Sequence, residues 1–290
     1  MADIRIAGVM RAGAFSPNHI GNDMAIFNLT AEALQKRGCS VRVYSEEEFR
    51  EADITEPVVM AMCREAESVE KLKRLEDEGR LVVNSGYGIE NCTRERMTRI
   101  LLGNGIPYPD SLIVNTNESV QKELEKAGFS RVWIKRGDLQ TIHREDVSFC
   151  RHPEEAQELL HEYFYRGIRR AVINRHLEGD LIKFYGISGT DFFYSFYPME
   201  AGHMKYDLQG EQGGSACFPY DAEALRQTCA KASELLDVKI YGGDCIVGSD
   251  GTFRIIDFND WPSFAPCRNE AAVIIAKTIY SMAQRKISGR

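Results

Sequence analysis

A carboxylate inside an apolar strand most constrains how this chain can fold. Asp257 lies within the largely apolar run at residues 253–260, which follows a second such run at residues 242–247. The Asp-Gly pair of the intervening segment 249–251 suits a hairpin turn, so the two runs are expected to be neighbouring antiparallel strands. An isolated carboxylate in such a run is costly, and Asp257 therefore needs a cation or hydrogen-bond donors beside it.

The spacing of the polar residues in these strands predicts a metal site. Asp257 and Asn259 are two residues apart and so share one face of the sheet, while Asp244 can lie opposite on the neighbouring strand. Two carboxylates and an amide oxygen, with water and phosphate completing six positions, suit Mg²⁺ or Mn²⁺ better than zinc. The alternative is a capped strand end, in which Asn259 and Asp260 bond local backbone.

Two further strands carry lysines in otherwise apolar surroundings. The predicted strand at residues 132–135 ends in Lys135, whose ammonium group can hold a phosphate while its stem packs inside. Lys183 lies in the middle of the predicted strand 180–187, a position that suits a lysine if an anion meets it. The alternatives are a solvated strand end for Lys135 and a solvent-exposed sheet face for Lys183.

Composition excludes several other classes of protein. The 290 residues, 43% hydrophobic and 27% charged, suffice for two or three folded units. No segment approaches the roughly 20 consecutive apolar residues of a membrane span, and the net charge of −7 disfavours nucleic acid as the main partner. The eight cysteines form no Cys-x-x-Cys pair, and the sequence contains no P-loop, serine-hydrolase or dinucleotide-binding motif. We expect a cytoplasmic protein that acts on small molecules.

The chain divides into three expected units. Strands and helices alternate over the first 88 residues, which predicts a doubly wound α/β layer. The predicted boundaries are residues 1–90 for this domain, 91–168 for a small α+β unit, and 169–290 for a second α+β unit with the metal site. The last helix, at residues 269–286, carries an apolar stripe that favours core packing.

The order of these strands, helices and polar segments along the chain resembles that of the ATP-grasp superfamily. The resemblance covers about residues 84 to 284, whereas residues 1–83 are similar only to the general α/β domain that precedes such folds. It implies an ATP-grasp fold of α/β and α+β units behind an N-terminal pre-grasp domain. ATP would lie between the two α+β units, and Asp244, Asp257 and Asn259 match the magnesium ligands of the family.

The resemblance also implies a set of nucleotide contacts. Arg94, at a position where the family commonly has lysine, would hold the phosphates together with Lys135 and Lys183. The hinge that recognises adenine and ribose would begin at Asn174, where the family usually has an acidic residue. The implied hinge residues are Asn174, Arg175, His176, Leu177 and Glu178.

The implied reaction is ATP- and Mg²⁺-dependent ligation. A small-molecule carboxylate would be converted to an acylphosphate and captured by an amine or thiol, with release of ADP and phosphate. Many ligases of this kind carry an arginine two residues before the first metal aspartate, but that position here is Gly242. A kinase that phosphorylates a hydroxyl, similar to the inositol-polyphosphate kinase branch, is therefore an alternative, and a non-catalytic ATP-binding module is another.

Position in the sequence indicates the catalytic and substrate residues. Lys183 and Arg268 are predicted to act in catalysis. The predicted substrate contacts are Arg11, Ser16 and Asn18 in the first strand-to-helix loop, and Ser263 and Arg268 after the metal strand. Turn and capping chemistry is the alternative for residues 16–18. A lid containing His143 is expected at residues 137–146, and a closing loop at 210–214. The expected partners are small-molecule substrates, without nucleic acid or a membrane, and a homodimer is a compatible assembly.

Overall fold

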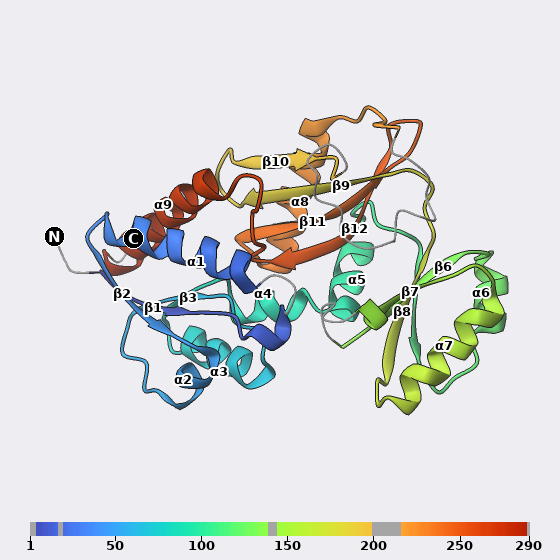
Figure 1. The fold of residues 1–290 in the computed structure, drawn as a ribbon, viewed down its shortest axis with the longest axis horizontal. Coiled ribbons are helices and arrows are strands. Elements are labelled where there is room, and N and C mark those ends of the chain that lie inside the picture. The colour runs from blue at the N-terminus through green and yellow to red at the C-terminus, as the bar shows by residue number, and fades with distance from the viewer. Residues whose placement is uncertain (1–3, 17–19, 139–143, 199–215, 289–290) are drawn as a thin grey trace.

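Three four-stranded sheets follow one another along the chain (Figure 1). The computed structural model describes residues 4–16, 20–138, 144–198 and 216–288. The first sheet lies at the left of the view, the third at the top and the second at the right. Within these described residues, no helix has both the length and the apolar character needed to cross a membrane.

The first sheet is parallel and has helices on both faces. Its strands are β1 (Ile4–Val9), β2 (Cys39–Tyr44), β3 (Val58–Ala61) and β4 (Leu81–Val83), in the order β2-β1-β3-β4. Helices α1 (Ile20–Gln35) and α9 (Arg268–Ile287) cover one face, and α2 (Glu46–Glu51), α3 (Ala66–Asp77) and α4 (Gly86–Asn91) cover the other (Figure 1). Burial on both faces explains the continuous apolar strands. The α/β unit predicted for the start of the chain is confirmed.

Helix α9 joins the two ends of the sequence. Its buried Ala272, Ile275 and Ile279 pack in one core with Ile26 and Ile6 of the first unit. The sequence grouped this helix with the third unit, and in the structure its apolar stripe packs in one core with α1 and the first sheet and with Ile187 and Ile240 of the third sheet. A short 3-10 helix, η1 (Gly13–Phe15), lies in the loop after β1.

The second sheet is antiparallel and covered by helices on one face. Its strands are β5 (Ser111–Asn115), β8 (Arg170–Arg175), β6 (Val132–Arg136) and β7 (Val147–Cys150), in the order β5-β8-β6-β7. Helices α6 (Gln121–Ala127) and α7 (Pro153–Tyr165) pack on the face that carries Ile134 and Ile173, and η2 (Arg144–Asp146) precedes β7. Because side chains alternate along a strand, Trp133, Lys135 and Asn174 occupy the opposite face.

The third sheet is antiparallel, and its edge strand contains a β-bulge. Its strands are β10 (Phe193–Phe196), β9 (Asp180–Ile187), β11 (Ile240–Val247) and β12 (Phe253–Asp260), in the order β10-β9-β11-β12. Helices α5 (Arg94–Gly103) and α8 (Ala222–Leu236) pack on one face. Asp257 pairs with Asp244 and Ile255 with Cys245, which leaves Ile256 as the bulged residue. Because of this extra residue, Ile255 and Phe258 both reach the core while Asp257 turns away from it.

Candidate functional site

Three charged side chains lie in a row across the third sheet. Lys183 on β9 is opposite Asp244 on β11, and Asp244 is opposite Asp257 on β12. The ammonium Nζ of Lys183 lies 2.6 Å from Oδ1 of Asp244. The side chains of Lys183 and Asp244 are 19% and 27% exposed, and that of Asp257 is 22% exposed, so a ligand can reach all three.

Asp257 is stabilised in its charged form. Burial on its own would raise the pKa of Asp257, but the charges of Arg94 and Lys135 and a hydrogen bond with Asn259 lower the pKa below its ordinary value. The Nη1 atom of Arg94 donates to Oδ1 of Asp257 at 2.8 Å. The cost of a carboxylate in an apolar strand is therefore offset by an arginine from the start of α5.

The bulge at Ile256 provides an acceptor at the free edge of β12. Nζ of Lys135 donates to the Ile256 carbonyl at 3.0 Å, and Nη1 of Arg94 lies 3.4 Å from the same oxygen. Lys135 comes from β6 of the second sheet, so both sheets and α5 meet at this point. Burial and the nearby charge of Arg94 lower the pKa of Lys135 to about 7, although Asp257 and Asp244 act in the opposite direction.

The close approach of β11 to its neighbours depends on two glycines. A Cβ atom on Gly243 would lie 2.1 Å from the carbonyl oxygen of Asp257, so only glycine lets β11 and β12 pair here. A Cβ atom on Gly242 would lie 2.7 Å from Cδ1 of Tyr185 and 2.8 Å from Cγ of Pro262. No side chain, and hence no arginine, fits at Gly242.

Part of the predicted hinge, residues 176–178, borders a cavity at the end of the β11–β12 hairpin. Asn174 is buried, its Nδ2 donates to Oγ of Ser111 at 2.7 Å, and its Oδ1 has no hydrogen-bond partner among the described residues. Nδ1 of His176 accepts from Nε1 of Trp133 at 3.1 Å. The cavity measures about 320 Å³, within the size range of small-ligand sites. It is lined by His176, Leu177, Glu178, Ile246, Gly248, Ser249, Asp250, Thr252 and Arg254.

Two hinge side chains, those of Arg175 and Glu178, form ion pairs with residues of the second unit. Arg175 pairs with Asp110 at 3.3 Å and donates to the Ala127 carbonyl at 3.0 Å, both in the second unit. Glu178 forms an ion pair with Arg131 and also lines the cavity. The adenine and ribose contacts of the hinge stay predictions.

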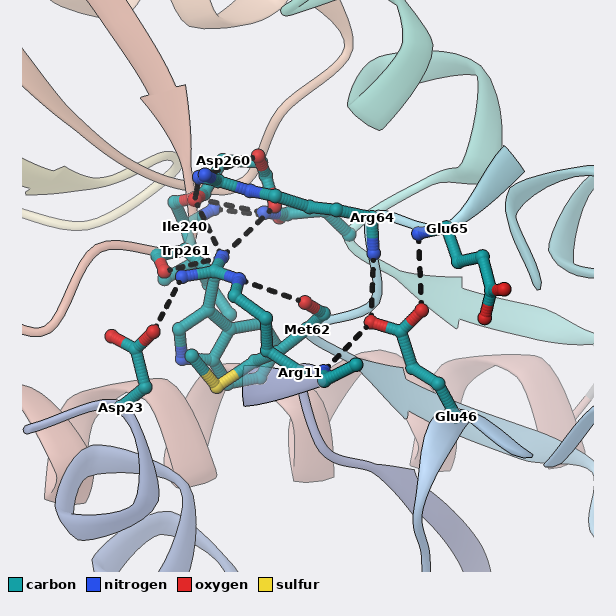
Figure 2. A network of polar contacts seen from close by, with 11 residues as sticks. Arg11, Asp23, Glu46, Met62, Arg64, Glu65, Ile240, Asp260 and Trp261 are labelled. Carbon is teal, nitrogen blue, oxygen red and sulfur yellow. Dashed lines mark hydrogen bonds and ion pairs between the residues drawn. The ribbon is translucent and has the colours of Figure 1, made fainter. Parts of the chain in front are cut away.

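Arg11 joins the first sheet to the end of β12. Its side chain is 4% exposed, and its guanidinium group lies 3.0 Å from Asp23 and 3.4 Å from Asp260 (Figure 2). It also donates to the carbonyl oxygens of Met62 at 3.1 Å and Trp261 at 3.2 Å. The guanidinium group of Arg11 therefore bonds to other groups of the protein. Its contact with substrate stays a prediction.

Of the other predicted substrate residues, Ser16 lines one small pocket together with Arg11, while Arg268 bonds elsewhere and Asn18 lies outside the described residues. Arg268 donates to Oδ1 of Asn22 at 2.7 Å and to the Ser263 carbonyl at 3.2 Å, and thus ties α9 to α1 and to the loop after β12. Ser16 is half-buried after η1. Asn18, His143 and the predicted closing loop at 210–214 lie outside the described residues, as do residues 139–143 of the predicted lid.

Sequence reasoning missed Arg64, which faces the same end of β12. Its Nη2 lies 3.3 Å from Oδ1 of Asp260, whereas its buried Nε has no hydrogen-bond partner in the described parts of the chain. The carboxylate of Glu46 accepts the backbone N–H groups of Ala12, Arg64 and Glu65 at 3.0 Å each and holds the loops after β1 and β3 in place (Figure 2). Arg64 follows the carboxyl end of β3, where open α/β sheets bind ligands, and this signal could have identified it.

Solved structures identify the fold. D-alanyl-alanine synthetase A from Vibrio cholerae has a TM-score of 0.72 at 10% identity and covers 99% of both chains. The D-alanine–D-alanine ligase from Bacillus anthracis complexed with ATP has a TM-score of 0.69 at 15% identity, covering 99% of this chain and 100% of that one. A RimK domain ATP-grasp protein from Sphaerobacter thermophilus has a TM-score of 0.66 at 16% identity, covering 95% and 99%. The sequence itself matches no family model and no curated protein. The predicted ATP-grasp fold with a preceding α/β domain is confirmed.

Proposed function

From its ATP-grasp fold, we propose that this protein is an ATP-dependent ligase that activates a small-molecule carboxylate as an acylphosphate. An amine or thiol would then displace phosphate, with ADP as the other product. The observation that carries the proposal is the meeting of Arg94, Lys135 and Lys183 with Asp244 and Asp257 between two sheets. Phosphoryl transfer requires cationic side chains that bind the phosphates and carboxylates that bind a metal ion, and both are present here.

The donor atoms around Asp257 fit Mg²⁺ or Mn²⁺. Asp244 lies directly opposite Asp257 on the neighbouring strand, and Asn259 forms a hydrogen bond with Asp257. Among the described residues, no cluster of three or more His, Cys, Asp or Glu could hold a metal ion. In this proposal the amide oxygen of Asn259 would therefore act as the third protein ligand beside Asp244 and Asp257. Phosphate and water would complete the octahedron that Mg²⁺ prefers. When bound, the metal would neutralise charge on the transferring phosphoryl group.

In this proposal, Asn174 would accept a hydrogen bond from the adenine amino group. The hydroxyl of Ser111 donates to the Pro109 carbonyl at 2.6 Å, so Oγ of Ser111 serves as the acceptor for Nδ2 of Asn174. This chain of bonds leaves Oδ1 of Asn174 as the unsatisfied acceptor. A buried acceptor without a partner costs about 1–3 kcal/mol, which a bound N–H donor would remove. Asn174 and Lys135 occupy the same face of the second sheet, two rows apart.

Lys135 should couple nucleotide binding and stability to pH. Its pKa is about 7 in the folded protein and near 10.5 when unfolded, so the unfolded chain binds more protons between these values. The free energy of unfolding should therefore rise with pH from about 7 to 10, by up to about 1.4 kcal/mol per pH unit from this group. Lys135→Met should remove this contribution and weaken ATP binding.

Denaturant unfolding at several pH values, for the wild type and Lys135→Met, measures the difference in slope. Because phosphates favour the charged ammonium, ATP binding at pH 8 should also take up a proton at Lys135. Calorimetry in buffers of different ionisation enthalpy detects this uptake. Equal ATP affinity and equal pH slopes in the two proteins would contradict the phosphate role.

We propose that Arg64 binds the substrate carboxylate that accepts the phosphoryl group. Arg11 already bonds to the carboxylates of Asp23 and Asp260 and to three carbonyl oxygens. In the described chain, the Nε of Arg64 has no hydrogen-bond partner, and the contacts of Arg64 with Asp260 are 3.3 and 3.5 Å long. Arginine binds carboxylates through paired N–H donors, so a substrate carboxylate fits this side chain. It would lie next to Asn259, at the metal end of β12.

Arg64→Met is expected to raise KM for the carboxylate about 10- to 100-fold, since a hydrogen bond to a charged group contributes about 1.5–3 kcal/mol. The dissociation constant for ATP should stay unchanged, because Arg64 is remote from the cations that meet at Ile256. Asp260 keeps Arg11 as a partner, so the variant should fold. Steady-state kinetics with each substrate varied in turn separate the two effects, and Arg64→Lys should show an intermediate KM. A selective increase in KM for ATP would exclude this assignment.

A product assay tests the ligase proposal against its main alternative. The absence of room for an arginine at Gly242 favours, as a second candidate, a kinase that phosphorylates a hydroxyl. The protein is incubated with Mg²⁺, ATP and pools of carboxylates, amines, thiols and polyols. Phosphate release that needs both a carboxylate and an amine or thiol supports the ligase. A stable phosphorylated product without free phosphate indicates the kinase, and ATP binding without turnover on any pool indicates a binding module.

A further inference from the structure

Both carboxylates of the proposed metal site are already held by the chain's own cations. Lys183 lies 2.6 Å from Asp244, and Arg94 lies 2.8 Å from Asp257. We propose that Lys183 acts as an internal counter-ion that excludes a divalent cation from Asp244 until nucleotide phosphates draw the ammonium away. The metal and the nucleotide would then load together. This inference rests on the proposed function, because it concerns the same site.

The geometry makes each ion pair a competitor for metal binding. A carboxylate oxygen bonded to an ammonium or guanidinium group offers fewer lone pairs to a metal, and the fixed positive charge repels a second cation. Arg94 and Asp257 are 4% and 22% exposed, and Lys183 and Asp244 are 19% and 27% exposed. Partial burial lowers the screening by water and salt, so the repulsion persists at ordinary ionic strength.

The two cations differ in how firmly they are held. Arg94 also bonds to the Ile256 carbonyl and to Tyr108, and it is almost fully buried. The ammonium group of Lys183 bonds only to Asp244 within the described part of the chain. A lysine on a flexible four-carbon stem can turn toward a phosphate without moving β9. We therefore expect the Lys183 side chain to move toward bound phosphates and the Arg94 side chain to stay in place.

Removing the charge of Lys183 should change metal and nucleotide affinity in opposite directions. In Lys183→Met, Asp244 loses its competitor, and the free protein should bind a divalent cation more tightly. The same change removes a phosphate contact, so nucleotide should bind more weakly. If Lys183 served only for packing, its replacement would not strengthen metal binding. If Lys183 only bound phosphate, its replacement would leave the metal affinity of the nucleotide-free protein unchanged.

Electron paramagnetic resonance of Mn²⁺ tests this directly, with and without the non-hydrolysable analogue AMP-PNP. In the wild type, AMP-PNP should tighten Mn²⁺ binding by at least about 10-fold, and Mn²⁺ should tighten AMP-PNP binding by the same factor. Lys183→Met, without nucleotide, should bind Mn²⁺ about 10-fold more tightly than the wild type. Lys231→Met removes one exposed charge from α8 of the same unit and should leave both affinities unchanged.

The outcomes separate this inference from the proposed function. Unchanged Mn²⁺ affinity in free Lys183→Met, with AMP-PNP binding retained by the wild type, overturns the counter-ion role and leaves the nucleotide site standing. Failure of the wild type to bind AMP-PNP in the presence of Mn²⁺ overturns the proposed function instead. Lys183→Gln provides a second neutral variant should Lys183→Met fold poorly, and circular dichroism checks both.

Discussion

Replacing Asp257 with asparagine is expected to lower turnover at least ~10³-fold while the protein still folds, because the proposed metal site would lose one of its two carboxylates. Asparagine keeps the shape of the side chain and an oxygen that can accept a hydrogen bond from Arg94. In the wild type, Nη1 of Arg94 lies 2.8 Å from Oδ1 of Asp257. The lost charge leaves Arg94 less well compensated, and the free energy of unfolding should fall by about 1–3 kcal/mol. ATP consumption and denaturant unfolding measure the two effects.

Asp191→Asn is the matched control for this change. Asp191 lies between β9 and β10 of the same sheet and is exposed. Its replacement removes the same charge from the same sheet at a distance from the ion pairs, so turnover should stay at the wild-type level. Full activity in Asp257→Asn would remove the metal assignment, and equal losses in both variants would point to net charge instead of a site.

Replacing Arg11 with methionine is expected to lower the free energy of unfolding by about 3–5 kcal/mol, because it leaves buried carboxylates without their partner. Asp23 and Asp260 are 7% and 0% exposed, and both bond to this guanidinium group. Arg64 still contacts Asp260, but Asp23 has no other ion pair in the described chain. Thermal and denaturant unfolding measure the loss of stability.

A surface arginine provides the comparison for Arg11. Arg226 pairs with Glu223 on α8, where both side chains are well exposed, and Arg226→Met should not change stability measurably. If Arg11 served substrate binding instead of joining the first sheet to β12, Arg11→Met would keep its stability and raise KM alone. The two outcomes decide between the predicted substrate contact and the interdomain contact in Figure 2.

Most of the fold could be predicted from local patterns, and the exceptions have physical reasons. Helix α2 (Glu46–Glu51) was missed because its six residues are mainly charged and only Glu46 and Phe49 are buried, so no apolar periodicity marks it. Helix α4 (Gly86–Asn91) contains two glycines, which lower helix propensity. Gly88 is needed there because a Cβ atom would lie 2.0 Å from the carbonyl oxygen of Asp237. Such a close approach to α8 is a tertiary constraint.

The candidate site divides in the same way. Alternation along a strand predicted that Asp257 and Asn259 share a face, and the hairpin turn predicted that Asp244 lies opposite; the structure has both arrangements. The bulge at Ile256 was not predicted, because the shift in register shows only in the pairing of β12 with β11. Arg64 was missed although it follows the carboxyl end of β3, because its contact with Asp260, 196 residues later, forms only in the tertiary structure.

The sequence by itself determined which side chains share a strand face, which segments are apolar enough to form a core, and that Asp257 requires a positive partner. Those properties follow from the two-residue period of a strand and from the cost of burying charge. Only the tertiary structure decided which cations meet that carboxylate. Arg94 is 163 residues away from Asp257, and Lys135 comes from another sheet. Contacts of this range depend on how whole layers pack, and a short segment of sequence does not contain that information.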